Sequence, residues 1–205
     1  MTRFVVIVLC AAASACAKPE APSPAAAPPP AAVSTGGTTG SVTGSVHATG
    51  TAVVVLEPQG AKTFAPPDDK PVMDQAGLMF GPELLLVRTG FPVEFRNSDD
   101  TLHNVRVSHE ETRTSAFNVA IPTGEQFTYT FDKDGFYRVG CDIHPAMAAS
   151  VFAATSPFTA VAGADGSFAF SDVPAGAWLV TAYVDGKRLH KDVEVGGGVT
   201  RVDIQ

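Results

Sequence analysis

The stretch CDIHPAM, residues 141–147, brings three metal-binding side chains together within seven positions. Cys141 offers a thiolate, His144 an imidazole and Met147 a thioether, and His103 offers a second imidazole far upstream, on or just after an expected strand. Two His and one Cys with a weak axial Met form the trigonal ligand set of copper sites that transfer electrons. A single tight loop cannot close such a site, so a distant strand must supply His103. We therefore interpret these four residues as a candidate site for one copper ion.

Asn104 and Pro145 are the expected supports of this site. Asn104 follows His103 directly, so its amide is placed to bridge the two ligand-bearing loops, most simply through the backbone or side chain of Asp142. Pro145 stiffens the ligand loop. Two alternatives stay open here. One is zinc, although its structural sites favour Cys and His without a thioether. The other is a fold that has lost its metal.

Other residues with ligand or acid–base chemistry are interpreted as surface or framework. His109 is expected on the same side of its strand as His103 but at the surface. Met73 is an alternative axial ligand only if a long loop folds inward. The pairs Asp99–Asp100 and Glu110–Glu111 are expected to be solvated turns.

The chain after about residue 40 has the pattern of short β-strands. Gly, Pro, Asn and Asp separate alternating or short apolar runs, and no stretch shows a convincing helical period. Many short strands with such turns predict a sandwich or barrel. In the first part we expect strands at residues 41–46, 52–56, 83–87, 91–95, 102–107, 127–131, 137–141 and 150–154, with residues 61–81 as the longest irregular connection.

The pattern changes at Ser156, where five closely spaced strands are expected. The turns at residues 163–166 and 184–186 are expected to join neighbouring strands as hairpins. A segment of about 50 residues is marginal for independent folding, so we expect it to pack on the first part. The five expected strands are residues 158–161, 166–170, 178–184, 191–195 and 199–204.

The N-terminus is interpreted as an export signal followed by a linker. A positive start at Arg3 precedes an apolar run, residues 4–13, that is too short to span a bilayer, and small residues lead up to Cys16. Cys16 fits either a lipid-carrying N-terminus or ordinary cleavage nearby. The following segment, residues 17–40, is rich in Ala and Pro and then in Ser, Thr and Gly, a composition typical of a linker.

The number of cysteines and the net charge limit the classes of function that fit this sequence. Cys10 and Cys16 lie in the signal region, so Cys141 is the one thiol of three expected in the folded part. A lone thiol in an oxidising compartment needs protection, which a bound metal would give. The formal net charge of −7 and the lack of a basic run argue against nucleic-acid binding. They favour a basic or locally positive partner.

These motifs resemble those of the cupredoxins, the blue copper proteins. The pattern Cys-x2-His-x2-Met of residues 141–147, with Pro after the His, is most similar to the short ligand loop of amicyanin. Residues 95–105, FRNSDDTLHNV, resemble the family's strand that ends in a ligand His followed by Asn. Residues 131–141, FDKDGFYRVGC, resemble the strand that leads into the copper loop. The resemblance implies a Greek-key cupredoxin β-sandwich with His103, Cys141, His144 and Met147 as copper ligands.

More specifically, the chain is similar to bacterial exported plastocyanin-like proteins, often labelled methylamine-utilisation proteins, that carry a carboxypeptidase-regulatory-like module after the cupredoxin. Residues 73–75 and 80–82 resemble their pre-strand loop, and residues 163–184 resemble the module. The module resemblance implies a small prealbumin-like β-sandwich without hydrolytic activity, because no catalytic zinc motif accompanies it. This chain departs from the family pattern after Cys141, where Asp-Ile stands in place of Thr-Pro or Ser-Pro.

Together these features predict an all-β exported protein. We expect a signal peptide at 1–16, a linker at 17–40, a cupredoxin domain at 41–155 and a carboxypeptidase-regulatory-like module at 156–205. The expected function is that of a type 1 copper protein of the periplasm or cell envelope, not an enzyme. It would pass single electrons to or from a c-type cytochrome or a periplasmic oxidoreductase.

Two other functions stay open. One is a copper carrier or sensor without a redox role, and the other is an adhesion module with incidental copper. In each case we expect a monomer that binds no nucleic acid and meets a membrane only through a lipid anchor at Cys16.

Overall fold

Sixteen β-strands make up the described part of the chain, which covers residues 37–205 of this computed structural model. No helix occurs among these residues, so none is present that could cross a membrane, and the prediction of an all-β protein is confirmed. The expected signal peptide and most of the expected linker fall on residues 1–36, outside the described residues.

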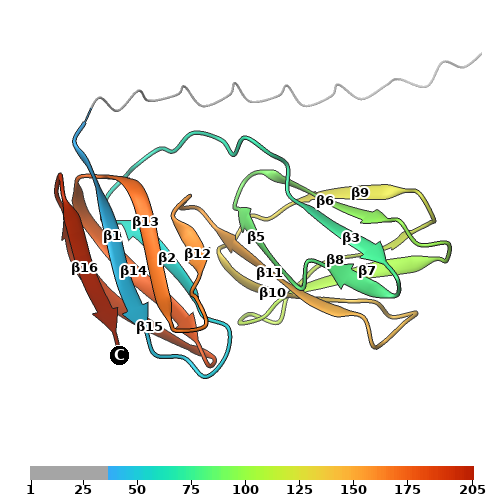
Figure 1. Cartoon of the computed structure of the whole chain (residues 1–205). Helices are drawn as coiled ribbons and strands as arrows, with labels where there is room; N and C mark the ends of the chain where they lie inside the picture. Colours follow the sequence, from blue (N-terminus) through green and yellow to red (C-terminus); the bar gives the residue numbers. More distant parts are fainter. Residues whose placement is uncertain (1–36) are drawn as a thin grey trace, which may run out of the picture. The chain divides into compact units, whose positions relative to one another are not determined.

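The expected metal-site residues belong to a sandwich of two sheets (Figure 1). Most neighbouring strands are antiparallel, and the pairs β11–β5 and β3–β6 are parallel. The five-stranded sheet has the order β5 (Leu84–Arg88), β11 (Ala148–Ala154), β10 (Gly135–Gly140), β7 (His103–His109), β8 (Ser115–Ile121), and the four-stranded sheet the order β4 (Met79–Gly81), β3 (Val72–Ala76), β6 (Pro92–Asn97), β9 (Gln126–Thr130).

Strand alternation directs the ligand-bearing strand into the core of this sandwich. Tyr137 and Val139 on β10, and Cys141 directly after it, are all buried in one hydrophobic cluster, because residues two apart along a strand point to the same face. Phe131 packs edge-on against Tyr137, with 4.6 Å between the ring centroids. The thiol therefore sits at the end of a rigid, close-packed layer rather than on a free loop.

A second sandwich contains the C-terminal strands, and it also takes in the first two strands of the described chain. The expected cupredoxin boundary at residue 41 is therefore wrong, because residues 39–58 pair with C-terminal strands. The alternating pattern identifies a strand but not its partner. The three-stranded sheet has the order β13 (Ser167–Pro174), β1 (Thr39–Val46), β16 (Val199–Ile204), and the four-stranded sheet the order β12 (Thr159–Val161), β2 (Val53–Pro58), β14 (Gly176–Val184), β15 (Lys187–Val195).

Strand β2 is apolar over most of its length because both of its faces are buried. Val54 and Leu56 point into the core of the second sandwich. Val53 and Val55 point the other way, into a separate cluster with Phe152 and other side chains of the first sandwich. A strand covered on both faces shows a continuous apolar run instead of alternation.

Several connections differ from the sequence prediction. The segment expected to be irregular, residues 61–81, contains the hairpin β3–β4, and β8 was not predicted. Strand β12 pairs with β2 rather than with β13, so the hairpin expected at residues 163–166 does not form, although a turn does. The hairpin β14–β15 is confirmed, with Asp185 and Gly186 both at positive φ, as a two-residue turn of type I′ requires.

The buried Tyr137 hydroxyl makes the stability of the fold depend on pH in the alkaline range. It donates a hydrogen bond to the Lys133 carbonyl, and burial, helped by the charge of Asp132, raises the pKa of Tyr137 to about 12. An unfolded tyrosine titrates near 10. The free energy of unfolding that depends on the neutral Tyr137 hydroxyl is therefore fully present below about pH 10. It is lost as the pH rises toward about 12, because the unfolded chain ionises more readily.

Between neutral pH and about pH 12, we expect the free energy of unfolding of Tyr137→Phe to fall by about 1–2 kcal/mol less than that of wild type. This is smaller than the full pKa difference would give, because solvent near the hydroxyl screens part of the effect. Urea unfolding of variant and wild type at neutral pH and near pH 12 measures the difference. At neutral pH the variant loses one hydrogen bond, about 1 kcal/mol. An identical pH dependence in the two proteins would show that Tyr137 does not carry the effect.

Candidate metal centre

Three side chains from two distant segments converge at one end of the first sandwich. His103 begins β7, and Cys141 and His144 lie on the loop between β10 and β11. The Nδ1 atoms of the two rings are 3.0 Å apart, and each lies 3.9 Å from the Cys141 Sγ. These donor atoms all lie within 4.8 Å of one another, close enough to share one ion.

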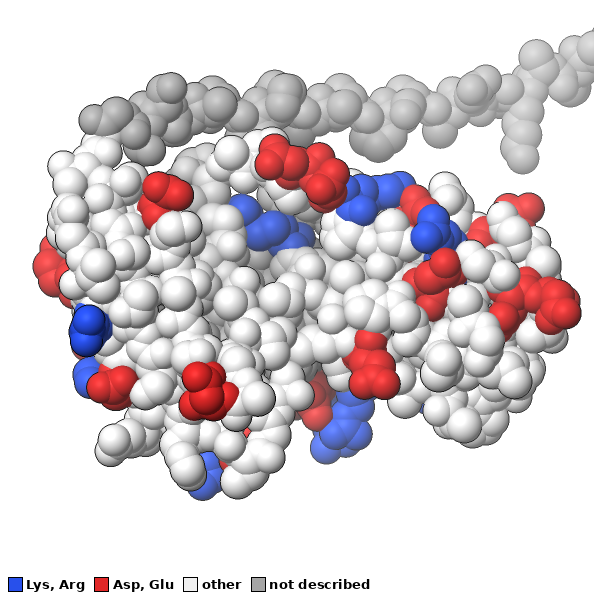
Figure 2. All heavy atoms as spheres, in the orientation of Figure 1, with Lys and Arg blue, Asp and Glu red and all other residues white. Residues whose placement is uncertain are grey.

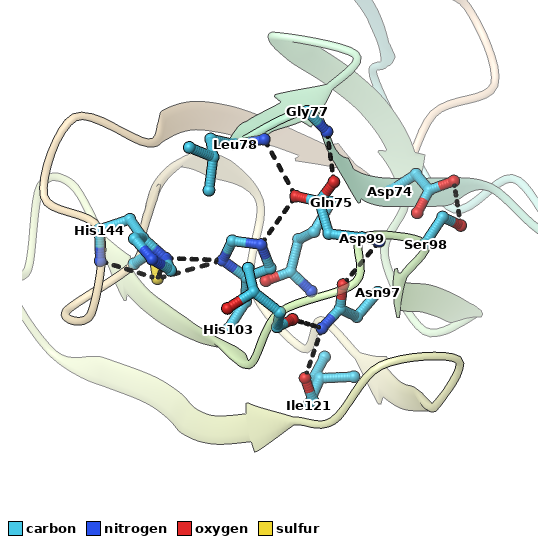
Figure 3. Close-up of polar contacts among 12 residues, drawn as sticks. Asp74, Gln75, Gly77, Leu78, Asn97, Ser98, Asp99, His103, Ile121 and His144 are labelled. Atoms are coloured by element: carbon cyan, nitrogen blue, oxygen red, sulfur yellow. Dashed lines mark hydrogen bonds and ion pairs between the residues drawn. The ribbon is translucent and has the colours of Figure 1, made fainter.

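The orientation of the His103 ring follows from a carboxylate on its other side. Asp99 Oδ2 lies 2.8 Å from His103 Nε2, and an ionised carboxylate only accepts hydrogen bonds. Nε2 therefore carries the proton, and in the neutral ring Nδ1 keeps its lone pair toward Cys141 and His144. Figure 3 shows the ring held between these two sets of contacts.

Met147 lies where the ligand loop returns to the sheet. Its backbone N–H donates to the His144 carbonyl over 2.9 Å, and its carbonyl accepts the Cys141 N–H over 3.3 Å. The Met147 side chain is buried in the same cluster as Cys141. The loop is thus closed on itself, with the thioether on the inner side.

Asn104 braces the two ligand-bearing segments, as its position after His103 predicted. Its Oδ1 accepts the backbone N–H of Asp142 over 2.7 Å and that of Ile143 over 3.3 Å. The same oxygen lies 3.4 Å from Cys141 Sγ. Because Asn104 is buried, removing its amide would leave two loop donors without a partner.

Asp142 fills the position at which this chain departs from the family pattern. Its carboxylate accepts Arg106 Nε over 2.7 Å, Asn118 Nδ2 over 3.0 Å and Asn104 Nδ2 over 3.2 Å. The hydrogen bond from Arg106 is the main reason that the pKa of Asp142 lies below its ordinary value. A charged clamp on the outside of the loop thus supplements the Asn104 brace.

The prediction that Asp99 belongs to a solvated turn is wrong. Its side chain is only 14 % exposed, and its carboxylate is held by Leu78 N–H, His103 and Gly77 N–H. These contacts, with the Leu78 N–H first, lower the pKa of Asp99. The signal in the sequence was the spacing of four from His103, but acidic pairs in turns are usually solvated.

Asn97 places Asp99 within its loop. Its Nδ2 donates to the carbonyls of Thr101 and Ile121, each over 2.8 Å, and its Oδ1 accepts the Asp99 N–H over 2.9 Å. Asn97 is almost fully buried, so this loop has a fixed form.

His109 is buried, so the prediction of a surface side chain is also wrong. It lies at the far end of β7 from His103, where its ring packs edge-on against Tyr137. Its Nδ1 accepts the Thr112 N–H and its Nε2 lies 3.2 Å from the Asp134 carbonyl. Both ring nitrogens are therefore used within the framework, away from the ligand cluster. Met73, weighed as an axial ligand, is a fully buried core residue of β3.

Residues 68–153 match the family of copper binding proteins of the plastocyanin/azurin type. This part of the chain is a cupredoxin. The matched residues include all four expected ligands and span the first sandwich from its β3 strand onward. The cupredoxin fold and the cluster of His103, Cys141 and His144 fit copper, because imidazole and thiolate donors together suit both of its oxidation states.

Several solved structures are similar to part of the chain. A mutant of amicyanin in its reduced form is 23 % identical, covers 43 % of this chain and 86 % of its own, and gives a TM-score of 0.39. A purple cupredoxin from Nitrosopumilus maritimus is 21 % identical over 42 % of this chain and 100 % of its own, with a TM-score of 0.37.

A copper-containing nitrite reductase from Thermus scotoductus SA-01 is 26 % identical over 48 % of this chain but only 25 % of its own, with a TM-score of 0.39. No curated protein matches the chain.

Loss of the Asn104 brace tests the construction of the site. We expect Asn104→Ala to lower the free energy of unfolding of the metal-free protein by about 1–3 kcal/mol, because the Asp142 and Ile143 donors lose their acceptor. Copper affinity should fall with it. Urea unfolding and competition with a copper chelator measure both effects.

Asn118→Ala is the matched control for this experiment. Asn118 contacts the same cluster but is exposed, so its loss should change stability by no more than about 0.5 kcal/mol. Equal losses from the two variants would contradict the assigned role of Asn104.

Proposed function

We propose that this chain is an exported type 1 copper protein that exchanges single electrons with a redox protein. The observation that carries the proposal is the convergence of two imidazole Nδ1 atoms and one cysteine sulfur on a point at the end of a rigid sandwich. Met147 completes the proposed ligand set as the weak axial donor. The proposed stoichiometry is one copper per chain.

The bound copper would supply a reversible one-electron couple, and the protein would hold its ligands still. Cys141 Sγ also accepts the His144 backbone N–H over 3.4 Å, a hydrogen bond that is stronger when the sulfur is charged. The β7 and β10 ladder, the Asn104 brace and the Asp142 clamp resist movement of the ligands. Small movement between oxidation states is what rapid electron exchange requires.

His144 offers the exit for the electron. Its ring is only half-buried, whereas His103 is fully buried, and the neighbouring Pro145 and Ala146 are exposed. Large apolar side chains are also exposed on the segments that carry the ligands and their supports. They are Leu78 (53 %), Met79 (65 %), Leu102 (47 %) and Ile143 (46 %). Such apolar surface next to a site is typical of a contact region for another protein.

The charge distribution supports a protein partner rather than a nucleic acid. The sequence has 21 acidic and 14 basic residues. On the face drawn in Figure 2 the basic side chains lie in small groups beside acidic ones and form no continuous basic surface. A c-type cytochrome or a periplasmic oxidoreductase with positive charges near its own centre would suit this surface.

Location and anchoring are proposed from the sequence of residues 1–16 alone. The positive start, the short apolar run and the small residues before Cys16 favour export, with Cys16 as a lipid-carrying end or a cleaved residue. We propose that the protein acts as a monomer without enzymatic activity. The described side chains around the site serve as proposed ligands or as supports of those ligands, Asp99 and Asn104 included.

Copper titration of wild type and Cys141→Ser tests the type 1 site. Wild type should develop an intense visible thiolate-to-copper band that saturates at one equivalent of Cu(II) and bleaches with ascorbate. The serine variant should show no such band, because a hydroxyl cannot replace the thiolate. A colourless wild type would refute the type 1 site.

The same protein distinguishes a carrier from an electron-transfer protein. If ascorbate reduction leaves copper bound and repeated oxidation restores the colour, electron transfer is supported. Release of the metal to a Cu(I)-binding acceptor on reduction would instead support the carrier or sensor.

The apolar surface next to His144 gives a further prediction. We expect Ile143→Glu to slow electron self-exchange between two copies of the protein about ten-fold, equivalent to roughly 1.4 kcal/mol, because like charges would meet at the contact. Line broadening in NMR spectra of mixed oxidation states measures this rate.

Val161→Glu is the control for charge alone. Val161 is similarly exposed, at 44 %, but lies on β12 of the second sandwich. An equal slowing in both variants would show that net charge, rather than contact at Ile143, limits the exchange.

A further inference from the structure

The turn between β3 and β4 lies against the copper-ligand network through one carboxylate. Ala76 pairs with Met79, so Gly77 and Leu78 form a two-residue hairpin turn. Both residues have positive φ, 61° for Gly77 and 59° for Leu78. This conformation is routine for glycine but rare for leucine, so the turn needs support from outside itself.

Asp99 provides that support. Its Oδ1 accepts the Gly77 N–H over 2.6 Å, and its Oδ2 accepts the Leu78 N–H over 2.9 Å. These are the two donors of the turn itself. The backbone keeps the two segments in place, because Ser98 N–H donates to the Gln75 carbonyl at the end of β3. The turn and the Asp99 loop are therefore in direct contact at several points.

The same carboxylate holds the ring of His103. Oδ2 lies 2.8 Å from Nε2, opposite the Nδ1 atom that faces Cys141 and His144. Figure 3 shows Asp99 between the backbone of the turn and the imidazole. One side chain thus makes three charge-assisted hydrogen bonds, two to a turn and one to a proposed metal ligand.

The turn also carries apolar side chains that face solvent. Leu78 and Met79 are the two most exposed large apolar residues of the cupredoxin part within the described chain. A side chain that fixes the turn therefore fixes where these residues stand relative to the ring of His103. The same carboxylate thus positions both the turn and the imidazole.

We propose that Asp99 is a positioning residue that ties His103 to the β3–β4 turn. It thereby fixes the position of the exposed Leu78 and Met79 relative to the proposed metal centre. It selects the His103 tautomer that leaves Nδ1 free, and it stabilises the positive-φ turn. The role of Leu78 and Met79 as partner contacts rests on the proposed electron-transfer function. The tie itself does not.

Asp99→Asn tests the tie in the metal-free protein. The amide keeps one acceptor oxygen with two lone pairs and loses the charge, so it cannot accept all three hydrogen bonds from the turn and the ring. Amide hydrogen exchange should become about ten-fold faster at Gly77 and Leu78. In the same sample, the ¹⁵N spectrum of His103 should show the tautomer with the proton on Nδ1.

Asp100→Asn is the matched control. Asp100 is the next residue, is exposed, and makes no side-chain hydrogen bond within residues 37–205. The charge change is identical, so both readouts should stay as in wild type. Unchanged exchange and tautomer in Asp99→Asn would overturn the proposal. A change at the turn without one at His103 would also overturn it, since Asp99 would then be a brace of the turn alone.

A consequence should appear on copper loading of the Asp99→Asn variant. Copper affinity should fall about 10- to 100-fold, the usual range for loss of a hydrogen bond to a metal-bound His. Electron self-exchange should also become slower, because Leu78 and Met79 would no longer be held in place for contact between two copies of the protein. A colourless wild type would refute the type 1 site. The hydrogen-exchange and tautomer results for Asp99→Asn would still test the tie, because they are measured on the metal-free protein.

Wild-type protein supplies a second measurement if Asp99→Asn does not fold. Cu(I) bound at Nδ1 makes the Nε2–H of His103 a stronger donor, so the shared carboxylate should transmit the change. The amide signals of Gly77 and Leu78 should then shift on Cu(I) addition, while that of Gly186 in the second sandwich should not. Unmoved Gly77 and Leu78 signals on Cu(I) binding would overturn the tie.

Discussion

The structure of this site depends on the antiparallel pairing of β7 with β10. That ladder sets Gly140 opposite Arg106 and so brings the start of one strand beside the end of the other. His103 and Cys141, separated by most of the sandwich in sequence, meet as a result. The buried cluster beneath them, which includes Tyr137 and Val139, resists any slip of this register, because a shift by one residue would turn the thiol outward.

Polar contacts then complete what the ladder begins. Asn104 binds the backbone of the ligand loop from inside, and Asp142 binds Arg106 and Asn118 from outside. The loop is short and carries three of the four proposed ligands, so it has little freedom once both sides are held. The protein framework by itself therefore holds the proposed ligands close together.

The two sandwiches of the chain are interleaved in sequence rather than placed one after the other. Strands β1 and β2 precede the cupredoxin, yet they complete sheets of the C-terminal sandwich. The first sandwich is thus inserted between β2 and β12 of the second. A cut at residue 155 would leave the apolar strand β2 without its partners β12 and β14. The second sandwich also meets the first through the cluster around Val53 and Phe152.

The sequence by itself determined the class of fold, most strands and the candidate ligands. Strand period and turn residues are local properties, and the ligand set consists of rare residue types whose order and spacing are specific. Asn104 was also identified, because it adjoins His103. Tertiary structure decided which strands pair, since alternation marks a strand but not its neighbour, and for this reason residues 41–58 were assigned to the wrong sandwich. It also decided the burial of His109 and the role of Asp99. An Asp in a turn and a His at a strand end are most often solvated. Here the β3–β4 turn and His103 hold the Asp99 carboxylate, and packing on Tyr137 buries His109, and the contacts with the turn and with Tyr137 join segments far apart in the sequence.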